Sequence, residues 1–222
     1  MADPINNTTE ARRPRGRPRS SATHIAILEA AYTLLEEVGL AGFTIEGVAA
    51  RAGAAKTTIY RWWPTRETLA VTAFLTVTGP RIAFPDTGCA VADITAQMLR
   101  LGEVYRGKTG RVVRDLIVAG HSDPEAASAF VNAYLKPRRE AVKTVLMRGI
   151  ASGELRAELN MEGLIDALYG PIFFRLLVGH GLLDGEWIQG VADVVLRGCL
   201  ADTPSGDPAS PEAARTKGST DE

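Results

Sequence analysis

Residues 42–63 read GFTIEGVAARAGAAKTTIYRWW, and the apolar positions within them recur at helical spacing. Apolar residues at helical spacing follow Thr44, which predicts a short helix with Thr44 as its N-cap and Gly53 as its stop. A second short helix is expected from about residue 55 to residue 62, because Pro64 disfavours its simple continuation. Two short helices joined by a turn that contains a glycine predict a helix-turn-helix.

The sequence on both sides of this motif also has helical periodicity. A helix is expected over residues 24–38, ended by Gly39, and another is expected after the motif with Thr65 as its cap. Further apolar periods predict helices over residues 91–105, 110–119, 124–151, 161–178 and 187–200. Prolines 137 and 171 fall inside these helices and predict kinks. No segment reads as a strand. The predicted fold class is all-α, with about nine helices in total.

Composition divides the chain into predicted parts. Residues 1–20 are rich in Pro, Arg, Asn and Thr, which predicts a disordered basic arm. Residues 21–68 are expected to form the three-helix helix-turn-helix domain for DNA binding, and residues 69–201 a larger helical ligand-binding and dimerisation domain. Residues 202–222 are rich in Pro, Ser, Ala and charge, which predicts a disordered tail.

Charge is distributed unevenly along a chain whose formal net charge is only −1. Five arginines fall within residues 12–19, and the chain after residue 201 is acidic, which indicates a polyanionic partner near the N-terminus. The polar start is unlike a signal peptide, and the most apolar run, residues 164–183, is too interrupted to span a membrane. We therefore expect a soluble, cytoplasmic protein. Cys89 and Cys199 have no metal-ligand spacing and are expected to be small buried side chains.

The composite pattern of residues 42–69 closely resembles the DNA-binding signature of the TetR family of repressors. The resemblance covers about the first third of the chain and includes the PTRETL segment at residues 64–69. It implies that the second short helix enters the major groove of DNA. Ala55 departs from the pattern, because family members often carry a capping Ser or Thr at this position, and losing such a cap costs about 1 kcal/mol of helix stability.

Short polar and long basic side chains of the motif are the predicted DNA contacts. With Ile59 turned inward, the polar face is left for base edges and phosphates. Thr44, at a helix N-terminus, is suited to a phosphate, and the resemblance implies that Tyr60 and Arg66 clamp the backbone. The alternative is a solvated helix face beside two structural tryptophans, which is the favoured interpretation for Trp63. The predicted contacts are Thr44, Lys56, Thr57, Thr58, Tyr60, Arg61, Trp62 and Arg66.

The basic arm contains Arg15-Gly-Arg17-Pro, which resembles the core of an AT-hook. In that motif, two arginines lie along a narrow minor groove. The alternative is an unstructured tail that raises affinity only through counterion release. The position of the arm just before the helix-turn-helix favours the first interpretation, so Arg15 and Arg17 are also predicted DNA contacts.

The resemblance further implies a C-terminal domain that dimerises and binds a small molecule. Its last two helices usually form the interface, here supplied by Leu164, Leu168, Ile172, Leu176, Val191 and Val195. Aromatic and polar groups in the regulatory helices are candidates for a pocket that suits an apolar or aromatic effector. Ordinary core positions are the alternative for each of them. These candidates are Tyr105, His121, Phe130, Tyr134, Tyr169 and Phe173.

The predicted function is a homodimeric repressor that releases a palindromic double-stranded operator when an effector binds. An activator of the same fold, or a helical binding protein, remains an alternative. An enzyme is disfavoured because the histidines are isolated in sequence and no nucleophile or dinucleotide motif is present. No cofactor, metal site, catalytic residue or membrane association is predicted.

Overall fold

The computed structural model describes residues 18–201 and the side chains from residue 21 onward. Within that range the regular elements are helical. Leu155 and Leu200, which lie in two different loops, form an isolated antiparallel bridge. No helix of the described part is long and apolar enough to cross a membrane. The elements are α1 (Pro18–Gly42), α2 (Ile45–Ala52), α3 (Lys56–Trp62), α4 (Arg66–Thr78), η1 (Pro80–Ile82), α5 (Ala90–Tyr105), α6 (Lys108–Ser122), α7 (Pro124–Ala129), η2 (Phe130–Leu135), α8 (Lys136–Ala151), α9 (Met161–Val178) and α10 (Gly185–Arg197).

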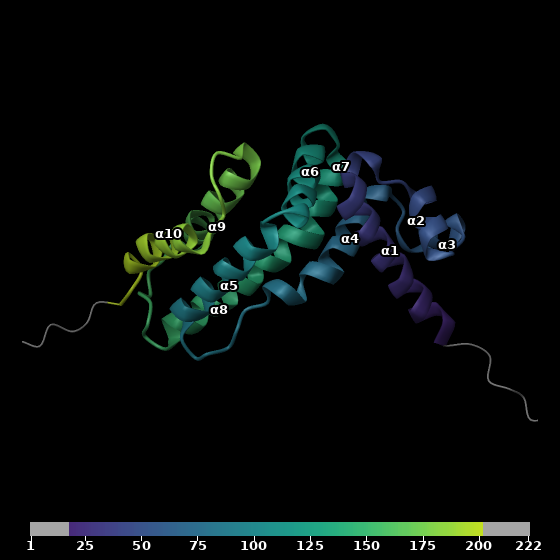
Figure 1. Cartoon of the computed structure of the whole chain (residues 1–222). Coiled ribbons are helices and arrows are strands. Elements are labelled where there is room, and N and C mark those ends of the chain that lie inside the picture. The colour runs from purple at the N-terminus through teal and green to yellow at the C-terminus, as the bar shows by residue number, and fades with distance from the viewer. Residues whose placement is uncertain (1–17, 202–222) are drawn as a thin grey trace, which may run out of the picture.

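The molecule is elongated, with α1–α3 at one end and α9 and α10 at the other (Figure 1). Helix α4 leads from the first group to the central helices α5, α6 and α8. If the continuous stretch α7–η2–α8 is counted once, residues 18–201 contain nine α-helices, which agrees with the predicted all-α fold.

The caps and stops predicted for the helix-turn-helix are confirmed. The Thr44 hydroxyl accepts a hydrogen bond from the Gly47 N–H at 3.1 Å, which satisfies one free donor of α2. Gly53 ends α2 with φ 61°, a left-handed conformation that glycine adopts without steric cost. Ile45, Val48 and Ile59 are buried between the helices, so both short helices are held by a shared core.

Helix α1 differs from its prediction at its start. It begins at Pro18, inside the segment predicted to be disordered up to residue 20, so that boundary was placed too late. A proline is well tolerated in the first turn of a helix because its missing N–H would have no intrahelical partner there. At the other end Gly39 has φ 68° and interrupts the helix where the stop was predicted.

The two interior prolines are accommodated differently. Before Pro137 the backbone adopts a π-helical turn, η2, which is a common response to a proline that cannot donate the usual hydrogen bond. Pro171 lies inside α9, and the helix continues on both sides of it.

The two cysteines have different environments. Cys199 is buried, as predicted, whereas Cys89 is exposed, contrary to the prediction. The Cys89 thiol caps the N-terminus of α5 and donates a hydrogen bond to Glu154 Oε1 at 2.8 Å, and this contact raises the pKa of the thiol.

Candidate functional site

Helix α3 presents one polar face to solvent. Ile59 is fully buried beneath it, while Lys56, Thr57, Tyr60 and Arg61 are exposed and Thr58 is half-buried. A seven-residue helix anchored by one inward isoleucine and held against α2 leaves these side chains free to meet a groove. The predicted polar side chains of α3 therefore reach solvent, Thr58 only in part. Arg15 and Arg17 lie outside the described residues.

The N-terminal ends of α2 and α3 are linked by an ion pair. Lys56 Nζ lies 3.0 Å from Glu46 Oε1, and both side chains are largely exposed. The hydrogen bond from Lys56 lowers the pKa of the Glu46 carboxyl, and the same contact raises the pKa of Lys56. Lys56 is therefore positioned by Glu46 when no DNA is present.

The start of α4 is tied to the helix-turn-helix. Arg66 donates from Nε to Glu67 at 2.7 Å and from Nη1 to the Phe43 carbonyl at 3.4 Å. Thr65 and Thr68 form a capping box at the same point. Ala55, by contrast, provides no side-chain cap for α3, as its sequence predicts.

A ring cluster that the sequence did not reveal joins α1 to α3. The His24 ring lies 4.4 Å from the Trp62 ring and 4.8 Å from the Trp63 ring, measured between centroids. Trp63 is buried, in agreement with its predicted structural role, while Trp62 is half-buried and its ring lies 5.9 Å below the guanidinium of Arg61. These tilted ring contacts tie α1 to the C-terminal end of α3.

Replacing Thr44 by Ala is expected to lower the free energy of unfolding by about 1 kcal/mol, because α2 loses its cap. Urea denaturation measures the change. Thr76→Ala is the matched control, since the Thr76 hydroxyl is exposed and bonds only to the Thr72 carbonyl of its own helix. Equal stability of the two variants would contradict the capping role.

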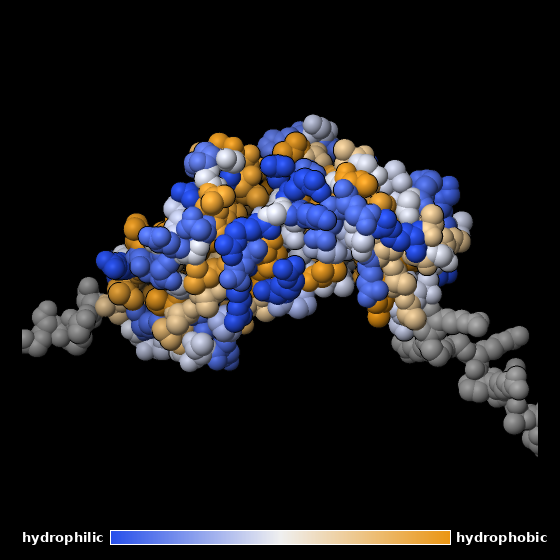
Figure 2. Space-filling view, in the orientation of Figure 1, coloured by the Kyte–Doolittle hydropathy of each residue, from blue (hydrophilic) through white to orange (hydrophobic). Residues whose placement is uncertain are grey.

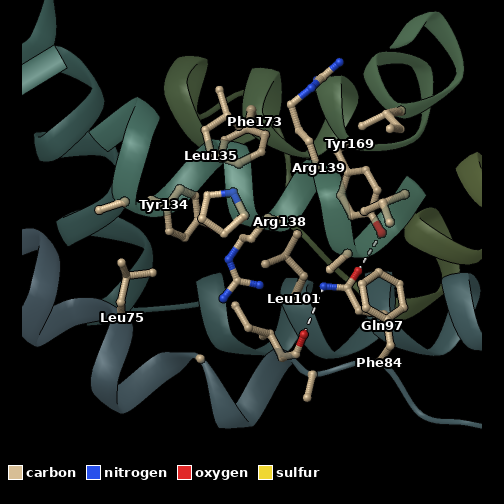
Figure 3. A pocket seen from close by; sticks show the side chains of 18 of the residues that line it. Leu75, Phe84, Gln97, Leu101, Tyr134, Leu135, Arg138, Arg139, Tyr169 and Phe173 are labelled. Carbon is tan, nitrogen blue, oxygen red and sulfur yellow. Dashed lines mark hydrogen bonds between the residues drawn. The ribbon is translucent and has the colours of Figure 1, made fainter. Parts of the chain in front are cut away.

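A cavity of about 490 Å³ lies between α4, η1, α5, η2, α8 and α9. Figure 3 shows its aromatic and aliphatic side chains. Of the predicted pocket residues, Tyr134, Tyr169 and Phe173 line it. The others do not: Tyr105 lies behind Tyr134 and shares a hydrogen bond with its hydroxyl, and Phe130 stacks on the Tyr134 ring.

His121 is the pocket prediction that the structure corrects most clearly. It lies in the last turn of α6, is exposed, and its Nδ1 is 3.0 Å from the Ile117 carbonyl of its own helix. The side chain is therefore away from the cavity lining. A lone histidine at a helix end gives no indication in sequence of which way it faces.

The polar groups of the cavity are few and partly paired with one another. The Tyr169 hydroxyl donates to Gln97 Oε1 at 2.7 Å, and Gln97 Nε2 donates to the Ile82 carbonyl at 3.2 Å (Figure 3). Burial raises the pKa of Tyr134 to about 12 and also raises that of Tyr169, so both phenols are neutral near pH 7. Gln97 was not among the predicted pocket residues. A glutamine on the largely apolar, buried face of α5 is unusual, and this was the signal in the sequence that could have indicated it.

Two adjacent arginines at the start of α8 have different surroundings. Arg139 pairs with Glu162 and lies 2.5 Å from Asp166 Oδ1. Arg138 lies over the Tyr134 ring, 4.9 Å from its centroid, and its buried Nε has no hydrogen-bond partner within the described part of the chain. Neither arginine was among the predicted pocket residues.

The predicted dimer residues divide into two groups. Leu164, Leu168 and Ile172 are buried in the protomer's own core, so they offer no surface to a second chain and the prediction is wrong for them. Leu176, Val191 and Val195 are half-buried. The apolar groups that α9 and α10 expose are instead Phe174, Leu177, Val178 and Val194. Figure 2 shows hydrophobic residues at the surface at this end of the molecule.

Comparison with known proteins matches both parts of the chain to one family. Residues 27–73 match the family "Bacterial regulatory proteins, tetR family", and residues 84–195 match "Tetracyclin repressor-like, C-terminal domain". An uncharacterized HTH-type transcriptional regulator of Bacillus subtilis is 38% identical over 187 residues, which are 84% of this chain and 94% of the relative.

Two further relatives agree with this assignment. The DNA-binding transcriptional repressor TetR of Mycobacteroides abscessus is 29% identical over 186 residues, covering 82% of this chain and 94% of the relative. The crystal structure of the TetR family transcription regulator SCO0332 superposes with a TM-score of 0.73 at 32% identity, covering 79% of this chain and 97% of that one. The helix-turn-helix, the helical second domain and these matches together show that the chain belongs to the TetR family of bacterial transcriptional regulators.

Proposed function

We propose that this chain is a homodimeric transcriptional repressor that leaves a palindromic operator when a small molecule occupies the cavity. The family is a class of DNA-binding regulators rather than of enzymes. The observation that carries the proposal is the course of α4. Its first residue, Arg66, contacts the Phe43 carbonyl of the helix-turn-helix, and residues near its other end, Leu75 and Gly79, line the cavity.

A ligand in the cavity can therefore change the position of the DNA-binding helices through α4. A ligand that binds more tightly when Leu75 is in one position shifts α4. Each α4 then moves the α3 helix of its own protomer, so both α3 helices of a dimer change position. A two-fold dimer reads half-sites one helical turn apart, about 34 Å, or a multiple of it. A change in that spacing therefore weakens binding to both half-sites together. The lining favours an apolar or aromatic effector.

The proposed DNA contacts are exposed and half-buried groups of the helix-turn-helix together with the arm. Residues 21–68 would form the DNA-binding domain and residues 69–201 the regulatory domain, with α4 crossing the boundary. Tyr60 is 49% exposed although it is aromatic, which suits a side chain that packs against the DNA backbone. The proposed contacts are Arg15, Arg17, Thr44, Lys56, Thr57, Thr58, Tyr60, Arg61, Trp62 and Arg66.

The proposed dimer face is the apolar surface of α9 and α10. Val194 is 79% exposed and lines a surface hollow with the half-buried Val191 and Val195, while α9 contributes Phe174, 60% exposed, and the half-buried Leu176. Single exposed apolar residues are ordinary on a protein surface, but a contiguous group of them marks an interaction site. Two copies of this face would form a four-helix interface.

Selection of genomic DNA fragments by the purified protein tests the proposal. We expect a palindromic site, with affinity reduced about ten- to a hundredfold in Tyr60→Ala and in Lys56→Gln. Lys136→Gln is the matched control, because Lys136 is an exposed lysine on α8, distant from α3, and should leave affinity unchanged. Sequence-blind binding in all four proteins would contradict specific readout. A reporter gene behind the selected site separates a repressor from an activator.

A further inference from the structure

The side chains that line the cavity include three charged groups, and two of them neutralise each other. Arg139 and Asp166 form an ion pair, and Glu162 contacts Arg139 from outside the lining. Arg138 is the third charge. No carboxylate within residues 18–201 pairs with it, and its buried Nε lacks a hydrogen-bond partner there. Among the side chains that line the cavity, Arg138 is therefore the charged group without an opposite partner.

An unpaired guanidinium in such a site is energetically costly. Nearly all of the other lining groups are apolar, and four of them are the aromatic residues Phe84, Tyr134, Tyr169 and Phe173. Arg138 is half-buried with its Nε buried, and charges that are partly removed from water are normally paired with an opposite charge. In Figure 3 the Arg138 side chain extends among the lining residues, whereas Arg139 points away from them. Arg138 thus faces the space a ligand would fill.

The contact between Arg138 and Tyr134 does not occupy the guanidinium donors. The Arg138 guanidinium carbon lies 4.9 Å from the Tyr134 ring centroid, a cation–π contact that leaves the N–H donors of the planar group available. Those coplanar N–H groups match the two oxygens of a carboxylate. The contact with Tyr134 therefore leaves Arg138 able to bind an anion through its N–H groups.

The other polar groups of the cavity already have hydrogen-bond partners, so Arg138 is the group expected to bind an anion. Gln97 is engaged by the Tyr169 hydroxyl and by the Ile82 carbonyl, so this pair is already satisfied without a ligand. Both phenols remain protonated near pH 7 and add no negative charge to repel an acid. A cavity of about 490 Å³ suits a small organic molecule.

We propose that the effector is an organic acid with an apolar aromatic or alkyl body, whose carboxylate is bound by Arg138. This inference rests on the proposed function, in which the cavity is the effector site. The acid neutralises the single unpaired charge, and its body lies among the aromatic rings and aliphatic side chains.

Calorimetry with matched compounds tests the inference. The probes are naphthaleneacetate, phenylpropionate and decanoate, each compared with its neutral amide. A charge-assisted contact predicts that at least one acid binds the wild-type chain about tenfold or more tighter than its amide. Arg138→Gln is expected to bring that ratio close to one, and Arg138→Lys to retain part of it. Arg114→Gln is the matched control and should leave the ratio largely unchanged, because Arg114 is an exposed arginine on α6 that does not line the cavity.

Each of the other outcomes overturns the inference. If the wild type binds each acid and its amide with equal affinity, there is no preference for negative charge. This result does not depend on whether any variant folds. A preference that survives in a folded Arg138→Gln variant assigns the anion to another group. Binding by none of the probes excludes these acids. Operator selection by the same protein is measured separately, so a specific DNA site with no acid preference leaves the proposed function standing and rejects only this ligand class.

Discussion

Phe74→Ala is expected to lower the free energy of unfolding by about 3–5 kcal/mol, because a fully buried phenyl group is removed from the junction of the two domains. Phe74 lies on α4, and its ring packs edge-on against the Tyr134 ring of η2 with 5.7 Å between centroids. The cavity left by the truncation cannot collapse easily between two helices that are each held elsewhere. Urea denaturation at a fixed protein concentration measures the loss, since dissociation of a dimer makes stability depend on concentration.

Thr76→Ala on the same helix is again the control and should change stability by less than about 0.5 kcal/mol, because Thr76 is exposed. Phe74→Leu retains most of the apolar volume and should cost roughly half as much or less. A Phe74→Ala variant as stable as the wild type would mean that α4 is not held by the regulatory domain, and the route proposed from cavity to DNA would fail with it.

Val194→Arg is expected to weaken dimerisation by about a hundredfold or more. In a two-fold interface each substitution is introduced on both sides, so the new charges lie near one another and are removed from water, a juxtaposition that costs several kcal/mol. Sedimentation velocity measures the dissociation constant, and operator affinity should fall in parallel because one helix-turn-helix contacts too few bases.

Val118→Arg is the matched control for this prediction. Val118 is 56% exposed on α6 and belongs to neither helix of the proposed face, so its substitution introduces the same charge outside that face. It should leave the oligomeric state unchanged. Unaltered dimers in the Val194→Arg variant would place the interface elsewhere on the molecule.

The helix-turn-helix could be predicted from the sequence because its determinants are local. Thr44, Gly53 and Thr65 act through hydrogen bonds or backbone angles within a few residues of themselves, and Ile59 is the one apolar residue in a polar stretch. The start of α1 was missed because an arginine-rich and serine-rich segment has no apolar period to show that a helix runs through it.

The second domain was less predictable because α9, which carries much of the predicted dimer surface, lacks a single apolar face. Helix α9 carries apolar groups on all sides, so the buried Leu168 and the exposed Phe174 look alike in sequence. The cavity depends on distant segments, since Gln97 meets Tyr169 from a position 72 residues away. Arg138 and Arg139 are identical neighbours in sequence, and only the positions of Glu162 and Asp166 distinguish them.

The ion pair between Glu46 and Lys56 bears on how this protein would discriminate among the sites of a chromosome. Any phosphate that approaches Lys56 competes with the Glu46 carboxylate, 3.0 Å away, and a displaced Glu46 then faces a polyanion. This penalty applies to every DNA segment, whereas base contacts that offset it form only at the operator. Operator occupancy depends on the ratio of specific to non-specific affinity, because millions of non-specific sites compete for the protein. By weakening non-specific binding more than operator binding, Glu46 would raise that ratio.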